Sequence, residues 1–296
     1  MGRAPLAKRC RPGASMGSGQ HQPVCVANSR DATLHHPVPM LLCPVRNCRV
    51  ELVRDGGGLL CACGHSFDVA RSGYINLLQP QERRSKHPGD TAEALSARRR
   101  LHDRGVTTPL LHGIAGASAV SRSDVILDAG CGEGFYVGSL AGETGCKGHG
   151  VDISTAAIQA AARRYPRCEW VVANADRFVP YADQSFTLVM SITGRMNPGE
   201  FRRVLRDDGR LLVAIPAPED LIELRGVGRD RLARTMATFT PGFTLVDRQR
   251  IATTADLDAA AVRDVLHSIY RPLRPQPVAA MRVTFCLDLL LFRPLR

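Results

Sequence analysis

The segment 125–135 constrains the fold of this chain more than any other. Its apolar run 125–127 ends in Asp128, glycines follow at every second position, and a predicted helix begins at residue 134. This order predicts a strand, a tight turn whose backbone approaches a ligand closely, and a helix whose N-terminus faces that ligand. Asp152 ends the next apolar run, where an open parallel sheet places ribose-binding carboxylates. The pattern therefore predicts a site for a nucleoside cofactor.

The spacing of the glycines indicates which cofactor. A dinucleotide site requires G-x-G-x-x-G, whereas the glycines here are Gly130, Gly132 and Gly134, with no basic residue in the turn. Asp128 suits a ligand with a positive amino group better than a pyrophosphate. The turn closely resembles the first motif of the S-adenosylmethionine-dependent class I methyltransferases. A glycine-rich turn without a ligand is the competing interpretation.

From residue 123 onward, predicted strands alternate with predicted helices. The helices are predicted at 134–142, 154–164, 198–206 and 256–268. The strands are predicted at 124–128, 147–151, 169–173, 185–191, 209–215, 242–251 and 280–292. Alternation at this spacing predicts a parallel sheet with helices on both faces, and the last two strands suit antiparallel strands that close it. We therefore expect an α/β fold over 123–296, with the Rossmann-like seven-stranded sheet of a class I methyltransferase.

Residues 40–79 predict a small zinc-binding domain ahead of this sheet. Four potential ligands form two pairs on either side of a hairpin-like turn at 55–58, an arrangement that brings four donors together tetrahedrally. So short a segment has little core, and the metal would stabilise it instead. The predicted metal ligands are Cys43, Cys48, Cys61 and His65. Cys63 is a rival donor, and a reduced cysteine cluster without metal is the competing interpretation.

The front of the chain carries most of the positive charge. Residues 1–110 hold 16 Lys or Arg against 8 Asp or Glu, in a chain whose net charge is +11. This asymmetry suggests a polyanionic partner, with an arginine-rich composition alone as the competing explanation. Within this part, residues 1–39 lack periodicity and predict a disordered extension. Met40 directly precedes the first segment with an ordered pattern, so the functional protein is expected to be able to begin there.

Residues 80–122 predict a basic helical linker between the zinc-binding domain and the sheet. Asp90 is predicted to cap a helix over 94–102, with a position facing the cofactor pocket as the alternative. A solvated helix face competes with phosphate contact as the role of its arginines. The candidates for phosphate contacts are Arg83, Arg84, Arg98, Arg99 and Arg100.

Cysteine usage and hydropathy indicate the compartment. Most of the ten cysteines are scattered singly and four cluster within 43–63, which favours metal binding in a reducing compartment over disulfides. The apolar run 287–292 is too short for a membrane span and contains Asp288, and the N-terminus lacks the apolar core of a secretory signal. We therefore expect a cytoplasmic protein without a membrane partner.

Both halves of the chain resemble one family. The sequence Cys-x3-His-Ser-Phe-Asp at 61–68, followed by 70–78, resembles the zinc module of the 23S rRNA guanine-N1-methyltransferases, which modify a guanine in hairpin 35. Residues 83–93 and 97–99 resemble the linker of these enzymes. The likeness runs from about residue 41 to the C-terminus. It implies methyl transfer from S-adenosylmethionine to a guanine N1 in ribosomal RNA, a bound Zn²⁺, and a homodimer, because such relatives are often dimeric.

The resemblance also implies the residues that hold the cofactor. The methionine end would lie on 130–133, and Asp152 would bind the ribose. Asn174 and Ala175 would edge the adenine, with Asp176 as the alternative partner of its amino group. The implied cofactor-binding residues are Asp128, Gly130, Cys131, Gly132, Glu133, Gly134, Asp152, Ile153, Asn174 and Ala175.

Four features depart from the family pattern. Cys43 and Cys48 are separated by four residues instead of the usual two. Thr107 falls near a position where the family can place an aromatic residue against the cofactor, and Asp220 replaces a histidine of some relatives. The segment 191–198 also differs, and it borders the target base, so substrate identity is the part that the resemblance supports least.

The catalytic group is not identified by the sequence. Guanine N1 must lose its proton, so a general base or a donor to O6 would help the reaction. Asn197 is a weak candidate for a contact with the base, and a helix start at Asn-Pro is the competing interpretation. Two other functions stay open, a small-molecule methyltransferase with an accessory zinc module and a non-catalytic zinc RNA-binding protein.

Overall fold

The computed structural model describes residues 39–82, 89–269 and 278–295. The residues from His36 onward belong to one compact unit, of which these ranges are the described part. The predicted disordered extension falls outside the described residues, apart from residue 39. Arg83 and Arg84, two candidates for phosphate contacts, also lie outside them.

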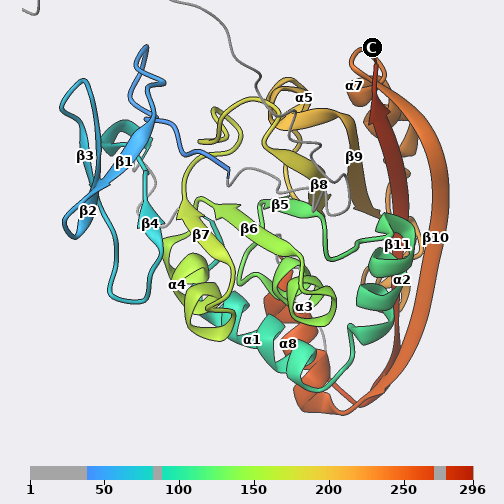
Figure 1. Cartoon of the computed structure of the whole chain (residues 1–296). Coiled ribbons are helices and arrows are strands. Elements are labelled where there is room, and N and C mark those ends of the chain that lie inside the picture. Colours follow the sequence, from blue (N-terminus) through green and yellow to red (C-terminus); the bar gives the residue numbers. More distant parts are fainter. Residues whose placement is uncertain (1–38, 83–88, 270–277, 296) are drawn as a thin grey trace, which may run out of the picture. The chain divides into compact units, whose positions relative to one another are not determined.

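An eight-stranded sheet forms the centre of this unit (Figure 1). Its strand order is β10-β11-β9-β8-β5-β6-β7-β4. The strands are β4 (Ile75–Asn76), β5 (Val125–Ala129), β6 (Lys147–Asp152), β7 (Glu169–Val172), β8 (Phe186–Ile192), β9 (Leu205–Pro216), β10 (Phe243–Leu257) and β11 (Met281–Pro294). All seven predicted strands are present, and the short β4 adds an eighth beside β7 that was not predicted.

The direction of the strands determines where a ligand can bind. β4 to β9 pair in parallel, and β11 runs antiparallel to both β9 and β10. Of the last two strands, β10 and β11, only β11 is therefore antiparallel to β4 to β9. The strand order reverses between β5 and β8, and the crevice at the carboxyl ends of such strands is where open α/β sheets bind ligands. Asp128 and the glycine turn lie at this point.

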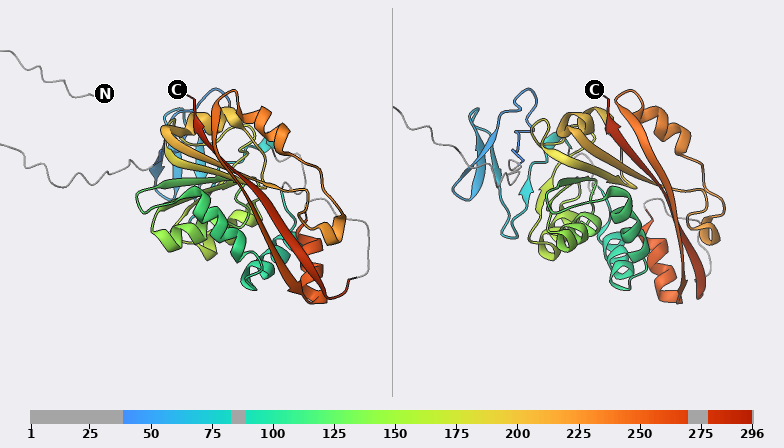
Figure 2. Two further views of the ribbon diagram at one scale, coloured as in Figure 1. Left: turned by 90° about the vertical axis from the view of Figure 1, so that its right-hand side faces the viewer. Right: turned by 45° about the vertical axis from the view of Figure 1, so that its right-hand side comes forward.

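Helices cover both faces of the sheet, as alternating strands and helices require (Figure 2). One core cluster combines side chains of α1 to α4 and α8 with one face of the sheet, and a second combines α5, α7 and the zinc-binding segment with the other. Neighbouring residues of β5, such as Ile126 and Leu127, belong to opposite clusters, as strand alternation requires. The helices are α1 (Ala92–Asp103), α2 (Thr108–Ser118), α3 (Phe135–Thr144), α4 (Thr155–Arg164), α5 (Pro198–Val204), α6 (Ile222–Arg225), α7 (Leu232–Phe239) and α8 (Ala259–Ser268).

The zinc module, residues 40–79, contains a separate antiparallel sheet and joins the main sheet at two places. Its strands are β1 (Leu52–Asp55), β2 (Gly58–Cys61) and β3 (Ser66–Asp68), in the order β1-β2-β3. The module ends in β4, which pairs with β7, and the amide of Leu42 donates to the carbonyl of Pro180 at 3.0 Å. This predicted domain is therefore joined to the main sheet by backbone hydrogen bonds.

The start of α1 differs from the prediction. Thr91 is its N-cap, because the Thr91 hydroxyl accepts a hydrogen bond from the amide of Ala94 at 3.1 Å. Asp90 is therefore not the cap, and its carboxylate pairs with Arg98 instead. Across the described ranges, we find no helix with the length and apolarity needed to traverse a lipid bilayer.

Candidate cofactor site and metal centre

The glycine turn after β5 has the backbone geometry that a closely bound ligand requires. The amides of Gly130 and Cys131 both donate to the carbonyl of Val151, at 2.8 and 3.1 Å, which fixes the turn against the end of β6. Gly130 has a φ of 87°, and the atom nearest to an added Cβ would be 3.8 Å away. An L side chain there would be strained, and its Cβ would come into van der Waals contact with Cα of Gly194. The absence of that side chain leaves the backbone accessible to a ligand.

Asp152 connects the end of β6 to this turn. Its carboxylate accepts hydrogen bonds from the amides of Gly132 at 2.9 Å and Ser154 at 2.8 Å. Burial raises the pKa of Asp152 above its ordinary value, while these two amides oppose the rise. The two amides hold the carboxylate at the strand end, where it can accept hydrogen bonds from the two ribose hydroxyls of a nucleoside.

Asp128 provides the clearest test of whether a cofactor fits this site. The residue is 1% exposed, and its Oδ1 has no hydrogen-bond partner among the described residues. Burial, with a smaller contribution from the charge of Asp152, raises the pKa of Asp128 to about 8. A buried carboxylate without a partner is costly unless a ligand compensates it. The ammonium group of S-adenosylmethionine would supply a positive charge at this position, so the residues present fit this cofactor.

Replacing Asp128 with asparagine is expected to make the cofactor-free protein more stable than the wild type, by a margin that grows as pH rises. The folded-state pKa of about 8 exceeds the ordinary value of 3.8 for an aspartate, so the folded wild type binds more protons than the unfolded chain between these pH values. The wild type therefore loses about 1.4 kcal/mol of stability per pH unit in this window, and Asp128→Asn does not. Urea unfolding should show the advantage of the variant growing by about 2–3 kcal/mol from pH 5.5 to 7.5.

Asp55→Asn is the control for this measurement, because Asp55 is exposed on β1. We expect its stability relative to the wild type to change little with pH. The difference in unfolding free energy between Asp128→Asn and the wild type could instead be the same at both pH values. That result would contradict a buried Asp128 carboxylate without a compensating partner.

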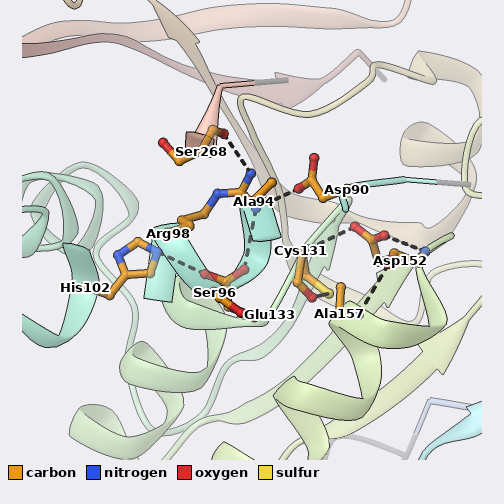
Figure 3. A network of polar contacts seen from close by, with 12 residues as sticks. Asp90, Ala94, Ser96, Arg98, His102, Cys131, Glu133, Asp152, Ala157 and Ser268 are labelled. Carbon is orange, nitrogen blue, oxygen red and sulfur yellow. Dashed lines mark hydrogen bonds and ion pairs between the residues drawn. The ribbon is translucent and has the colours of Figure 1, made fainter. Parts of the chain in front are cut away.

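The helix α1 lies over the turn and carries a network of charged side chains (Figure 3). Arg98 pairs with Asp90 at 2.7 Å and with Glu133 of the turn at 3.5 Å. The other oxygen of Glu133 lies 3.4 Å from Nε2 of His102, whose ring stacks on Phe135 at a centroid distance of 3.7 Å. Burial lowers the pKa of His102, so the arginine is the main positive partner of Glu133.

Two of the arginines predicted to contact phosphates are engaged inside the unit. Arg98 is held as described above, and Arg100 forms a two-pronged pair with the buried carboxylate of Asp264, with its closest contact at 2.6 Å. Arg99 is more exposed and lies 3.8 Å from Asp103. Of the three, Arg99 is the one whose geometry leaves it most available to a phosphate.

The residues predicted to edge the adenine follow β7. Oδ1 of Asn174 accepts a hydrogen bond from the amide of Asp176 at 3.2 Å. The Nδ2 group of Asn197 donates to the carbonyls of Ala175 and Asp176, both at 3.0 Å, and its Oδ1 accepts from the amide of Glu200. Asn197 thus caps α5 and fastens the loop that carries Asn174. This geometry matches the helix-start interpretation of Asn197, with both of its amide hydrogens used.

The other departures from the family pattern also have defined surroundings. Thr107 is buried, and its hydroxyl lies 2.5 Å from Nδ1 of His102, which fixes the orientation of the ring. Asp220 pairs with Arg225 at 2.7 Å and accepts a hydrogen bond from the amide of Cys286. Burial raises the pKa of Asp220. Ile153 is half-buried directly after Asp152. It packs against the core cluster that contains side chains of α1 to α4 and α8.

The four predicted metal ligands come together in the zinc module. One ligand atom from each of Cys43, Cys48, Cys61 and His65 lies within 4.8 Å of the others. Nδ1 of His65 is 3.3 Å from the Cys61 sulfur and 3.5 Å from that of Cys43. Three thiols and one imidazole at such distances are the donor set of a tetrahedral zinc site, so the residues fit Zn²⁺. Cys63 is exposed and does not belong to this group.

The unusual spacing of the first pair is accommodated in its turn. The amide of Cys48 donates to the carbonyl of Val45 at 2.9 Å, and that of Cys43 donates to Val50 at 2.8 Å. Asn47 adopts a φ of 66°, a left-handed conformation that asparagine tolerates better than most residues. The two additional residues are therefore taken up in the turn, and both sulfurs still reach the cluster.

Comparisons with known proteins agree with both sites. Residues 41–86 match a zinc-ribbon family model described as "RlmA, N-terminal", and residues 126–213 match one described as "Methyltransferase domain". A solved TehB-like SAM-dependent methyltransferase from Corynebacterium glutamicum aligns with 69% of this chain and 99% of its own, at 18% identity and a TM-score of 0.44.

Two curated relatives match most of the chain. A relative from Micromonospora griseorubida is 36% identical over 212 residues, which is 64% of this chain and 70% of the relative. The "23S rRNA (guanine(748)-N(1))-methyltransferase" of Streptomyces fradiae is 34% identical over 243 residues, which is 77% of this chain and 84% of the relative. This chain therefore belongs to the family of 23S rRNA (guanine-N1)-methyltransferases.

Proposed function

We propose that this chain transfers a methyl group from S-adenosylmethionine to the N1 atom of a guanine in 23S ribosomal RNA. The observation that carries the proposal is the 34% identity to the S. fradiae enzyme over 243 residues, which is 77% of the chain. The donor set at Cys43, Cys48, Cys61 and His65 supports the binding of one Zn²⁺ by the zinc module.

In this proposal the residues around the turn bind and orient the cofactor. Asp152 binds the ribose hydroxyls, Asp128 compensates the ammonium group, and the loop with Asn174 and Ala175 edges the adenine. The bound cofactor supplies a sulfonium methyl group for in-line displacement. The contribution of the protein is to align donor and acceptor and to exclude water. Because both amide hydrogens of Asn197 hold the adenine loop, we assign Asn197 the positioning of that loop.

The test is to incubate the purified protein with labelled cofactor and unmodified ribosomal RNA, and to map the labelled nucleotide. Label at a guanine N1 of 23S RNA supports the proposal. Label found only in small metabolites would favour a small-molecule methyltransferase. Failure to bind S-adenosylmethionine would favour a non-catalytic zinc RNA-binding protein.

A guanine N1 is accessible only when the base is unpaired or flipped out, so the enzyme must hold the RNA backbone while the base enters the site. In the zinc module Arg46, Arg54 and Arg71 are exposed, and we assign them contacts with phosphates. Binding of an RNA hairpin should therefore weaken about 10- to 100-fold between 50 and 200 mM salt.

Replacing these three arginines with glutamine tests the assignment. The slope of log affinity against log salt should fall in magnitude by about 2 to 3, because each of the three lost phosphate contacts lowers it by roughly 0.7–0.9. Arg234→Gln is the control, since Arg234 is exposed on α7 of the catalytic domain. An unchanged slope in the triple variant would place the RNA contact elsewhere.

We further propose that the enzyme acts in the cytoplasm and as a homodimer. The substrate of this family is ribosomal RNA, which supports action in the cytoplasm. The excess of positive charge in residues 1–110 would allow two copies of the chain to bind one RNA, which supports a dimer. Light scattering of the zinc-loaded protein should give twice the mass of one chain. The mass of a single chain at micromolar concentration would rule out a stable dimer.

A further inference from the structure

Arg98 lies beside the glycine turn, in a position that the cofactor contacts proposed above do not use. Its Nη1 reaches Asp90 and Glu133, and its Nη2 donates to the backbone carbonyl of Ser268 at 3.3 Å (Figure 3). A Cβ added to Gly132 would be 3.4 Å from the same Nη1. The guanidinium therefore lies directly against the backbone on which the methionine end of the cofactor is expected to lie.

Carboxylates surround this position. Asp128, Glu133 and Asp152 come from the sheet and the turn, and Asp90 comes from the segment before α1. Among the described residues, Arg98 is the arginine whose charge acts on both Glu133 and Asp152. S-adenosylmethionine has a sulfonium, an ammonium and a carboxylate. The carboxylates of the pocket suit the two positive groups, whereas the carboxylate of the cofactor requires a cation.

The hydrogen-bonding capacity of Arg98 is not exhausted by its contacts. A guanidinium has five N–H donors in one plane and binds carboxylates in a two-pronged manner. Within the described ranges, the contacts to Asp90, Glu133 and Ser268 use donors on Nη1 and Nη2 and leave the Nε–H and one Nη2–H for a further acceptor. The Arg98 side chain is 27% exposed, so a ligand can reach it.

We propose that Arg98 binds the α-carboxylate of S-adenosylmethionine, with Asp90 and Glu133 orienting its guanidinium. This inference rests on the proposed function, because it requires the cofactor to lie on the glycine turn. It assigns Arg98 to the cofactor, whereas its neighbour Arg99 stays available to solvent or to RNA. The helix α1 then takes part in cofactor binding in addition to linking the zinc module to the sheet.

The test compares binding of S-adenosylmethionine with binding of its decarboxylated form, by calorimetry without RNA. The two ligands share the adenosine, the sulfonium and the amino group and differ only in the carboxylate. We expect Arg98→Gln to weaken binding of S-adenosylmethionine about 10- to 100-fold, as for loss of a charge-assisted pair. Binding of the decarboxylated form should be unchanged or tighter, because a positive charge near a doubly cationic ligand has been removed. Arg99→Gln is the matched control and should alter neither affinity.

Each other outcome has a distinct meaning. Equal losses for both ligands would give Arg98 a purely structural role, and no loss for either would remove it from the site; both results overturn the inference. A wild type that binds neither ligand would overturn the proposed function as well. If Arg98→Gln does not fold, Arg98→Lys gives the same comparison, because it keeps the charge but loses the planar fork. It should show a smaller loss, confined to the ligand with the carboxylate.

Discussion

Replacing Cys61 with serine is expected to reduce zinc content from one ion per chain to well below one, and to unfold the zinc module. Cys61 is buried, and its sulfur is 3.8 Å from that of Cys48 and 3.3 Å from Nδ1 of His65. Serine is a poor ligand for zinc, so the variant keeps three donors of a four-donor site. In zinc-finger peptides the metal contributes about 10–16 kcal/mol of apparent binding free energy to folding. A module with three short strands has no core large enough to replace that contribution.

Cys63→Ser is the matched control, because Cys63 lies two residues along the same turn and is exposed outside the cluster. It should retain one zinc ion per chain, as measured by elemental analysis of the purified protein. Hydrogen exchange should report unfolding of 41–76 in Cys61→Ser alone. A Cys63→Ser variant that loses zinc, or a Cys61→Ser variant that retains it fully, would contradict the ligand set.

The consequences of zinc loss should extend into the catalytic sheet. Backbone hydrogen bonds join Leu42 to Pro180 and β4 to β7, and the guanidinium of Arg49 lies 4.8 Å from the ring centroid of Phe178. Phe178 follows the loop that is expected to edge the adenine. Disordering the module therefore removes contacts from the loop at 174–180, and exchange there should also rise in Cys61→Ser.

The parts of the site that lie close together in sequence could be predicted from it. The cysteine and histidine pairs are each within a few residues of one another, so their spacing predicted the cluster but left Cys63 as a rival donor, which the structure places outside it. The turn at 128–134 and the acid at Asp152 follow from the order of strand, turn and helix, which a parallel sheet imposes locally. Several of the main strands, such as β5, β8 and β11, contain apolar runs that are visible without a structure.

What the sequence did not reveal depends on contacts between distant residues. Arg98 meets Glu133 and Ser268 across 35 and 170 positions, and no local pattern distinguishes Arg98 from Arg99. The strand β4 has only two residues, too few to show a period of two. Asp90 and Thr91 are both good caps by composition, and the choice between them depends on the ion pair with Arg98.

Replacing Asp152 with alanine is expected to weaken binding of S-adenosylmethionine by about 100-fold or more. The variant would remove the hydrogen bonds that we propose to both ribose hydroxyls, each worth about 1.5–3 kcal/mol when the acceptor is charged. It also removes the acceptor for the amides of Gly132 and Ser154, which hold the turn against β6. Calorimetry measures the loss directly, and a melting temperature that no longer rises with the cofactor reports it independently. The control is Asp208→Ala, because the Asp208 carboxylate is exposed on β9 and its contact is with Arg206 at 3.6 Å.

A second pair of ligands separates ribose binding from support of the turn. The wild type should bind adenosine more tightly than 2′,3′-dideoxyadenosine, because only the first offers hydroxyls to Asp152. Asp152→Ala should bind both equally, whereas damage to the turn alone would weaken both and preserve the preference. Undiminished cofactor binding by Asp152→Ala would be incompatible with this site. Among the described residues, Asp152 is the one carboxylate at the end of β6 that accepts a hydrogen bond from the glycine turn.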